Sequence, residues 1–189
     1  MLEKKKILRK IIKVRVSAIS PEERKKREEI LHNNLFSMPE FVAAKSVMLF
    51  ANLPDEIGTF SLIDKCISMG KKVFLPVING DDMTACEFKG EYKIGRYGIK
   101  EPSLLTPNSS LFPNGHQHVL TPNSIDFVLV PGVAFSPNGY RLGRGKGYYD
   151  KFLSKYSNLF TVGVCFREQF YLDIPTEPHD IPMQKVIVC

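Results

Sequence analysis

The segment "IDFVLVPGVAFSPNGYRLGRGKGYYDKFL", residues 125–153, joins an apolar run, a basic glycine-rich stretch and a second apolar pattern. The run at 125–135 is short and mainly aliphatic, which is typical of a strand buried on both faces of a parallel sheet. The apolar residues that follow recur at helical spacing: Tyr149, Phe152, Leu153 and Tyr156. The segment therefore predicts a strand, a loop and a helix in succession, with the loop at the carboxyl end of the strand.

Apolar runs and helical patterns alternate along the rest of the chain. Further strands are predicted at 45–53, 71–78, 160–166 and 185–189, with a hairpin partner for the second of them at 83–89. Helices are predicted at 2–16, 148–156, from Ser20 to about Phe36, and from Gly58 to Met69 with Gly70 as the stop. Residues 101–124, rich in Pro, Ser, Asn and Thr, predict an irregular surface loop. This alternation predicts an α/β fold with a mostly parallel sheet, and 189 residues suit a single domain.

Two local patterns define the N-terminal helices. In the first helix, Leu8, Ile11 and Ile12 fall at i, i+3, i+4 and predict a narrow apolar stripe. The second helix begins at "SPEER", residues 20–24, where the serine is the expected N-cap and the proline takes the first helical position. Glu23, three residues after the cap, completes a capping box.

The net charge of +6 is concentrated at the N-terminus. Residues 1–20 contain seven basic side chains and one acidic side chain, whereas the remaining residues contain 19 of each sign. Lys5 and Arg9 are four residues apart and therefore project from one face of the first helix. Two interpretations stay open: a polyanionic partner, or a helix that delivers cations to one small anionic ligand.

Other classes are disfavoured by composition. The chain has no run of 18 apolar residues, and its basic N-terminus lacks the apolar core of a signal peptide, so a soluble cytoplasmic protein is expected. The cysteines form no CxxC pair and have no histidine at metal-ligand spacing, so they are interpreted as small core residues: Cys66, Cys86, Cys165 and Cys189.

The glycine-rich stretch between strand and helix has the composition of an anion site. Glycines let the backbone approach a ligand, successive amides favour an anion, and Arg141, Arg144 and Lys146 add charge-assisted donors. These features favour a polyphosphate, although a merely solvated basic turn is the alternative. The spacing differs from a Walker A loop, which would need glycine at Tyr140, and from a dinucleotide fingerprint, which would need glycine at Tyr148.

The stretch "NGYRLGRGKGYYD", residues 138–150, closely resembles the signature of the 5-formyltetrahydrofolate cyclo-ligase family. Further features agree in order along essentially the whole chain: the Lys5 and Arg9 pair, "SPEER" at 20–24, "DEIGT" at 55–59, "VPG" at 130–132 and "EPHD" at 177–180. The resemblance implies an enzyme that converts 5-formyltetrahydrofolate and ATP, with Mg²⁺, into 5,10-methenyltetrahydrofolate, ADP and phosphate. It also implies a single domain over 1–189, a three-layer sandwich with a mostly parallel, Rossmann-like sheet.

The resemblance also implies residue roles. ATP would be bound by Lys5, Arg9, Arg141, Leu142, Gly143, Arg144, Gly145, Lys146, Gly147, Tyr148 and Tyr149. The folate substrate would be bound by Ala51, Glu56, Arg144, Gly145, Lys146, Gly147 and Tyr148. Metal binding maps to Asp150 and Asp180, and catalysis to Arg144, Lys146 and Tyr148, with Arg144 hypothesised to stabilise the phosphoryl transition state. The expected partners are the two substrates, with no nucleic acid, no membrane and a monomeric state.

Several alternatives stay open at the level of sequence. Glu56 has a second interpretation as an acid beside the start of the helix near Gly58. Tyr149 fits a core position as well as a ligand contact, and His179 fits a structural role as well as acid–base chemistry. The competing function classes are a nucleic-acid-binding module that uses the basic N-terminus and another enzyme with a phosphate ligand, such as a sugar-phosphate isomerase.

Overall fold

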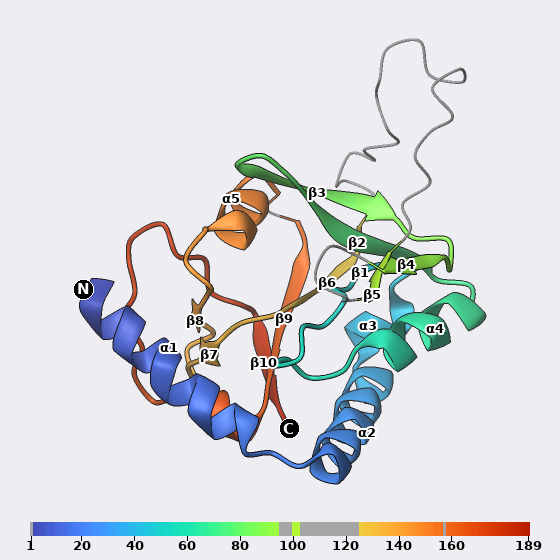
Figure 1. Ribbon diagram of the computed structural model, residues 1–189. Coiled ribbons are helices and arrows are strands. Elements are labelled where there is room, and N and C mark those ends of the chain that lie inside the picture. Colours follow the sequence, from blue (N-terminus) through green and yellow to red (C-terminus); the bar gives the residue numbers. More distant parts are fainter. Residues whose placement is uncertain (1, 95–99, 103–124, 157) are drawn as a thin grey trace.

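The computed structural model describes residues 2–94, 100–102, 125–156 and 158–189 (Figure 1). In this described part, six strands form one sheet in the order β10-β9-β6-β1-β2-β3. Its strands are β1 (Ser46–Met48), β2 (Lys72–Asn79), β3 (Asp82–Glu87), β6 (Phe127–Val130), β9 (Phe160–Cys165) and β10 (Lys185–Val188). Neighbouring strands pair in parallel except for the β2–β3 hairpin, which is antiparallel. The prediction of an α/β fold with a mostly parallel sheet is confirmed.

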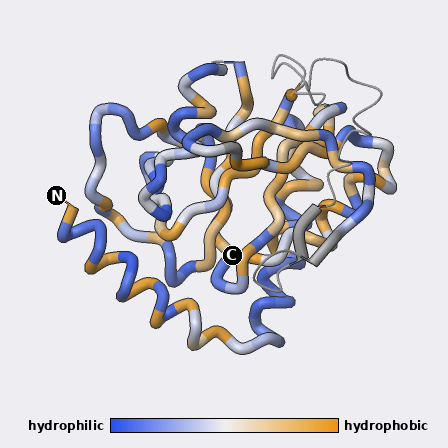
Figure 2. The backbone as a smooth tube through the Cα atoms, turned by 45° about the horizontal axis from the view of Figure 1, so that its top comes forward, coloured by the Kyte–Doolittle hydropathy of each residue, from blue (hydrophilic) through white to orange (hydrophobic). Residues whose placement is uncertain are grey.

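Helices cover both faces of the sheet, as Figure 1 shows. They are α1 (Leu2–Ser17), α2 (Pro21–Ser37), α3 (Pro39–Ala43), α4 (Phe60–Ser68), α5 (Tyr148–Ser154) and the short 3₁₀ helix η2 (Arg167–Gln169). Alternating strand residues divide between two hydrophobic clusters: Val47 packs with residues of α1 to α4, whereas Met48 packs with Phe152 and Leu153 of α5. This period of two on fully buried strands gives a layer of helices on each side, and Figure 2 shows the hydrophobic residues gathered on these strands.

Two predicted strands are longer than the strands that form. The apolar run at 45–53 pairs in the sheet only over Ser46–Met48, because the chain then bends into a loop that Thr59 closes by bonding to the Phe50 carbonyl and the Asn52 side chain. The run at 125–135 divides into β6 and β7 (Ala134–Phe135), and β7 pairs with β8 (Arg141–Leu142) in a small separate sheet. The two apolar runs predicted burial correctly, but they overestimated the length of the strands.

The predicted apolar stripe of α1 is partly wrong. Ile12 is buried and Leu8 packs against the core, but Ile11 is 43% exposed, and the inward face also includes Lys5 and Val16. The sheet side of this helix therefore carries a lysine in line with aliphatic residues, a pattern that a search for apolar spacing does not detect.

The second helix begins as predicted at Ser20, whose hydroxyl accepts a hydrogen bond from the Glu23 amide. The Glu23 carboxylate pairs with Arg27 one turn later. Gly70, with φ of 76°, ends α4 as predicted.

The remaining elements are small or lie outside the described residues. β4 (Tyr92–Ile94) and β5 (Lys100–Pro102) form a two-stranded sheet, so part of the predicted loop at 101–124 is a strand, and 103–124 lie outside the described residues. The four cysteines are buried and free, and burial raises the pKa of Cys66 to about 11. Among the described helices, none is long and apolar enough to span a bilayer.

The strand order reverses direction between β1 and β6. From β1 the chain adds β2 and β3 on one side, and later β6, β9 and β10 on the other. The loop after β1 and the loop after β6 therefore lie side by side at the carboxyl edge of the sheet, at the switch point where open α/β sheets bind ligands.

Candidate active site

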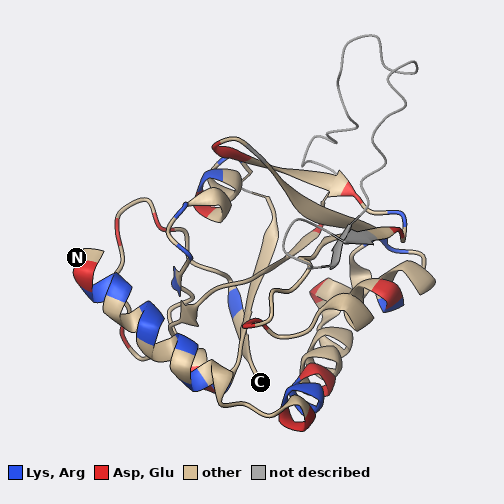
Figure 3. Ribbon diagram, viewed as in Figure 1, with Lys and Arg blue, Asp and Glu red and all other residues tan. Residues whose placement is uncertain are grey.

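A cavity of about 490 Å³ lies between α1, the glycine-rich loop and the segment at 177–180. Most of the predicted site residues line it: Lys5, Arg9, Arg141, Leu142, Gly143, Gly145, Lys146, Gly147, Asp150 and Asp180. Residues more than 170 positions apart in the chain thus line one cavity, and Figure 3 shows basic residues spaced along α1.

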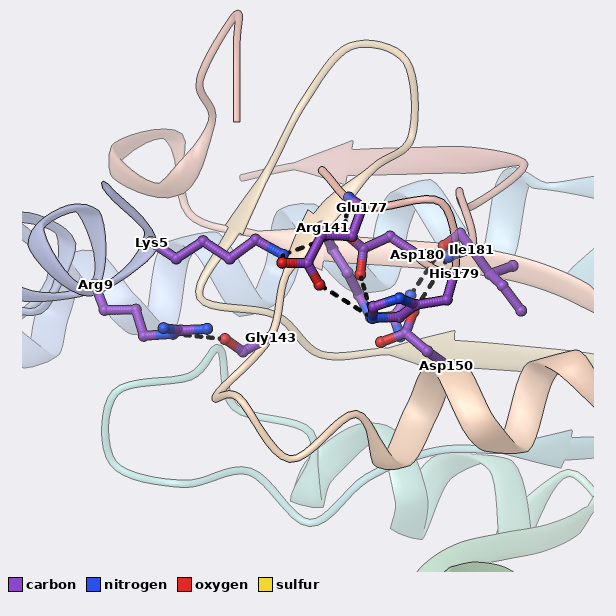
Figure 4. Close-up of polar contacts among 9 residues, drawn as sticks. All are labelled: Lys5, Arg9, Arg141, Gly143, Asp150, Glu177, His179, Asp180 and Ile181. Atoms are coloured by element: carbon purple, nitrogen blue, oxygen red, sulfur yellow. Dashed lines mark hydrogen bonds and ion pairs between the residues drawn. The ribbon is translucent and has the colours of Figure 1, made fainter. Parts of the chain in front are cut away.

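The glycine-rich loop owes its shape to backbone conformations that side chains disfavour. Gly145 and Gly147 have φ of 101° and 68°, in the left-handed region. The carbonyl of Gly143 accepts a hydrogen bond of 2.9 Å from Nε of Arg9, which ties the loop to α1 (Figure 4). Arg9, one of the residues predicted to bind ATP, therefore contacts the glycine-rich loop directly.

Lys5 is the most buried cation contributed by α1. Its side chain is 11% exposed, and Nζ lies 3.3 Å from Oδ2 of Asp180 and 3.6 Å from Oε1 of Glu177. The Oδ2 atom of Asp180 also accepts a hydrogen bond from the Glu177 amide. The two carboxylates hold the ammonium group of Lys5 beside the cavity, which Lys5 and both acids line.

Arg141 is buried beneath the cavity and holds Asp150. Its guanidinium donates to Oδ1 of Asp150 at 2.8 Å and to the carbonyl of Ile181 at 3.0 Å (Figure 4). Burial lowers the pKa of Arg141, while the charge of Asp150 opposes that shift. An arginine retains its proton under these conditions, so Arg141 and Asp150 form a fixed ion pair that lines the cavity.

Asp150 and Asp180 could supply oxygen ligands to a cation beside a phosphate. Within the described residues, no group of three or more His, Cys, Asp or Glu side chains is arranged to hold a metal. Mg²⁺, however, is commonly held by one or two carboxylates together with phosphate oxygens. Two aspartates that line a cavity rich in hydrogen-bond donors for an anion fit that donor set. One oxygen of Asp150 already accepts from Arg141, and one oxygen of Asp180 accepts from Lys5.

Arg144 connects the glycine-rich loop to the acidic loop after β1. Its Nη2 donates to Oδ1 of Asp55 at 2.6 Å and to Oε1 of Glu56 at 3.0 Å. The Glu56 side chain is only 10% exposed, and its second oxygen accepts a hydrogen bond from the Leu53 amide. Burial raises the pKa of Glu56, and the Leu53 amide and Arg144 oppose that shift. The interpretation of Glu56 as an acid near a helix start thus omits its ion pair with Arg144.

A second cavity, of about 170 Å³, adjoins the first and shares Arg9 with it. Arg144, Asp55 and Lys13 line this smaller cavity, together with Val133 from the loop after β6. Neighbouring residues of the glycine-rich loop line the larger cavity, but Arg144 itself lines the smaller one. Apart from its place in the "DEIGT" stretch, no feature of the sequence indicated that Asp55 belongs to the site.

Four predicted residues line neither of these cavities: Ala51, Glu56, Tyr148 and Tyr149. The Tyr148 hydroxyl donates to the carbonyl of Gly80, at the tip of the β2–β3 hairpin. The Tyr149 hydroxyl is buried without a hydrogen-bond partner among the described residues, burial raises its pKa, and its ring lies 5.9 Å from the Arg141 guanidinium. A core position therefore accounts for the ring of Tyr149, but it does not account for the buried hydroxyl.

Sequence reasoning missed other lining residues. Lys151 and Ser154 extend the larger cavity along α5, and Glu177 and His179 close its far side. The side chain of His179 is 70% exposed, and its Nε2 lies 3.3 Å from Oε2 of Glu177. The helical spacing of 147, 151 and 154 was the available signal for the first two residues.

Comparison with known proteins gives a consistent result. The family model described as the 5-formyltetrahydrofolate cyclo-ligase family matches residues 1–189. A probable 5-formyltetrahydrofolate cyclo-ligase of Caenorhabditis elegans is 31% identical, with 98% of this chain and 92% of the relative covered. The 5-formyltetrahydrofolate cyclo-ligase of Escherichia coli is 29% identical, with 94% and 96% covered.

Solved structures give the same result. The NMR structure of Aquifex aeolicus 5,10-methenyltetrahydrofolate synthetase superposes with a TM-score of 0.79 at 31% identity, covering 97% of this chain and 89% of that one. The Mycoplasma pneumoniae 5,10-methenyltetrahydrofolate synthetase, at 21% identity, shares the fold with a TM-score of 0.72 over 97% of both chains.

Proposed function

The chain is an enzyme of the 5-formyltetrahydrofolate cyclo-ligase family, and from this premise we propose that it closes the ring of 5-formyltetrahydrofolate at the expense of ATP. The products are 5,10-methenyltetrahydrofolate, ADP and phosphate. The observation that carries the proposal is the larger cavity, where cations from α1 and the glycine-rich loop converge, beside the smaller cavity that the loops after β1 and β6 line.

The larger cavity is the proposed ATP site. Lys5 and Arg9 approach from α1, Lys146 lies on the opposite loop, and Arg141 supports that loop from below. The remaining proposed contacts are the loop residues Leu142, Gly143, Arg144, Gly145, Gly147, Tyr148 and Tyr149. Several cations around one polyphosphate offset its charge without bulk water.

The folate site is proposed on the acidic side, where Glu56 and Ala51 follow β1. A carboxylate suits the donor-rich edge of a pterin ring, and Glu56 is buried enough to make such a contact specific. Arg144 bridges to this loop from the glycine-rich loop, so the folate formyl group and the γ-phosphate would meet near Arg144. Gly145, Lys146, Gly147 and Tyr148 complete the proposed folate contacts.

The reaction has two steps in this proposal. The formyl oxygen attacks the γ-phosphorus, its bond to ADP breaks, and the poor leaving group becomes a phosphate ester. N10 then attacks the activated carbon, loses its proton, and phosphate departs as the ring closes. Arg144 and Lys146 offset the negative charge that develops on the transferred phosphoryl group.

The tyrosine and the aspartates have distinct roles. Tyr148 would enclose the activated formyl group, because water would otherwise compete with N10. Asp150 and Asp180 would hold Mg²⁺, which supplies electrostatic stabilisation of the phosphates. Arg141 holds Asp150 and Lys5 holds Asp180, and both aspartates line the cavity.

One assay tests the proposal. Purified protein is mixed with Mg-ATP and 5-formyltetrahydrofolate, and methenyl absorbance and ADP are followed together. We expect equimolar formation of both, dependent on both substrates. ADP without the methenyl product, or no ADP at all, would contradict it. A steep salt dependence of RNA or DNA binding would instead favour a nucleic-acid module. The cytoplasmic location and monomeric state expected from the sequence stay predictions.

A further inference from the structure

Arginines join, in pairs, three of the segments that line the smaller cavity. The segments are α1, the acidic loop at 50–59 and the glycine-rich loop at 143–147. Arg9 of α1 bonds to the Gly143 carbonyl, and Arg144 of the glycine-rich loop bonds to both acids of the acidic loop. The third pair, α1 and the acidic loop, is joined by Arg24 of α2.

Arg24 makes three hydrogen bonds to backbone carbonyls. Nη2 donates to Val16 in the last turn of α1 at 2.6 Å, and Nε donates to Ile19 just after that helix at 3.3 Å. Nη1 donates to Pro54 of the acidic loop at 3.1 Å. Pro54 directly precedes the acids that hold Arg144, so one planar guanidinium sets the distance between the end of α1 and the start of the acidic pair.

The chemistry of these contacts requires arginine. A guanidinium presents donors in a rigid fork, whereas a lysine ammonium is a single point on a flexible stem. Carbonyls at the end of a helix have no partner within the helix, so a cation there is favoured. Arg24 lines neither cavity, and it therefore acts on any ligand only through the segments that it joins.

We propose that Arg24 is a positioning residue that holds the folate-side acidic loop in register with the nucleotide-side helix. The proposal rests on the function proposed above. ATP would still bind without Arg24, because the direct link from Arg9 to Gly143 remains. The formyl group, however, would no longer be aligned with the γ-phosphate, and misplacement by about 1 Å costs on the order of a hundredfold in rate.

The matched control lies one turn along the same helix. Arg27 is also half-buried and also lies over the Phe166 ring, with its Cζ 5.8 Å from the centroid against 5.1 Å for Arg24. Its partners are Glu23, Glu168 and the Cys189 carbonyl, which belong to neither loop of the site. R27M therefore removes the same group from the same ring without breaking the link between α1 and the acidic loop.

The experiment compares R24M, R24K and R27M with the unaltered protein at a temperature well below unfolding. For R24M we expect kcat/KM for 5-formyltetrahydrofolate to fall about 10- to 100-fold, with the calorimetric Kd for a non-hydrolysable ATP analogue within about twofold. R24K should lie between R24M and the unaltered protein, and R27M should keep both quantities within about twofold. Unchanged kcat/KM in R24M, or an equal loss in R27M, overturns the proposal.

Amide hydrogen exchange separates this proposal from the function on which it rests. In R24M, residues 52–58 and 14–19 should exchange faster than in the unaltered protein, and in R27M they should not. If the unaltered protein fails to form the methenyl product, the proposed function fails while exchange still tests the link. Equal exchange of both segments in R24M and the unaltered protein refutes the positioning role. If R24M does not fold, R24K carries the same two readouts.

Discussion

At the scale of single residues, the candidate site pairs three of its cations with carboxylates. Lys5 faces Asp180, Arg141 faces Asp150, and Arg144 faces Glu56. A buried charge left without a partner would be costly, so these pairs keep the cations in place before a ligand arrives. A bound polyphosphate would compete with the carboxylates for the same donors.

Arg144 is expected to matter more for turnover than for nucleotide affinity. In Arg144→Gln, loss of the charge beside the transferred phosphoryl group should lower kcat by about 10²- to 10³-fold. The Kd for ATP, measured by calorimetry, should change by less than about tenfold, because Lys5, Arg9 and Lys146 remain around the cavity. Unchanged kcat at saturating substrates would remove Arg144 from the transition state.

Glu56 is expected to set the folate affinity and its pH dependence. Glu56→Gln should raise KM for 5-formyltetrahydrofolate by about tenfold or more and leave the KM for ATP near normal. Because burial raises the pKa of Glu56, its charge is lost, as pH falls, at a higher pH than for an ordinary glutamate. As pH falls, the folate KM should therefore begin to rise at a pH above the range in which an ordinary glutamate titrates.

The pH profile of Glu56→Gln provides the control, since the amide does not titrate. The acid-side rise of the folate KM should be absent in this variant. A variant that instead raises the ATP KM alone, or that keeps the same acid-side rise, would contradict the assignment of Glu56 to the folate.

At the scale of elements, one aromatic ring attaches the small β7–β8 sheet to the large one. A Cβ added to Gly163 in β9 would lie 2.2 Å from the Phe135 ring, and one added to Gly132 would lie 2.7 Å from it. The ring of this β7 residue thus packs directly on backbone of the central sheet. β8, which carries Arg141, is positioned by this contact and by the pairing of Phe135 with Arg141.

Gly163→Ala is expected to destabilise the fold by overpacking. Because Phe135 is fully buried and has no room to move away, we expect a loss of about 1–3 kcal/mol in the free energy of unfolding. Gly143→Ala is the matched change, since its added Cβ meets nothing within 4 Å, and it should stay within about 0.5 kcal/mol. Denaturant titration measures both, and equal stability losses would refute the packing argument.

Local patterns predicted most elements but not their ends. The helix start at Ser20 and the stop at Gly70 depend on neighbouring residues, and both are confirmed. The ends of β1 and β6 depend on Thr59 and on the pairing of Phe135 with Arg141, which lie farther along the chain. Hydrophobic runs report burial, whereas a strand ends where its partner ends.

At the scale of the whole molecule, the site joins the two ends of the chain. Lys5 and Asp180 are 175 residues apart and meet across the larger cavity. The N-terminal excess of charge, which left a polyanionic partner open, contributes its inward-facing cations to this cavity. Binding of one polyphosphate would therefore connect α1, the glycine-rich loop and the segment before β10.

Mg-ATP is expected to stabilise the folded protein as a whole. Saturation at about 100 times Kd corresponds to about 2.7 kcal/mol, seen as an upward shift of Tm in a thermal scan. In Lys5→Gln the shift at the same ATP concentration should be smaller, because the affinity falls. Lys10→Gln, an exposed change on the same helix, should keep the full shift. An equal shift in all three proteins would place ATP away from Lys5.

The sequence by itself determined the order of elements, the mostly parallel sheet and the residues of the glycine-rich loop, because period, capping and turn chemistry act over a few neighbouring positions. The Lys5 and Arg9 pair was identified in the same way, from four-residue spacing and resemblance. Only the tertiary structure decided that Arg144 meets Glu56, 88 residues away, and that Arg24 joins α1 to the acidic loop. Such contacts depend on which loops share the switch point of the sheet, and no local pattern encodes that.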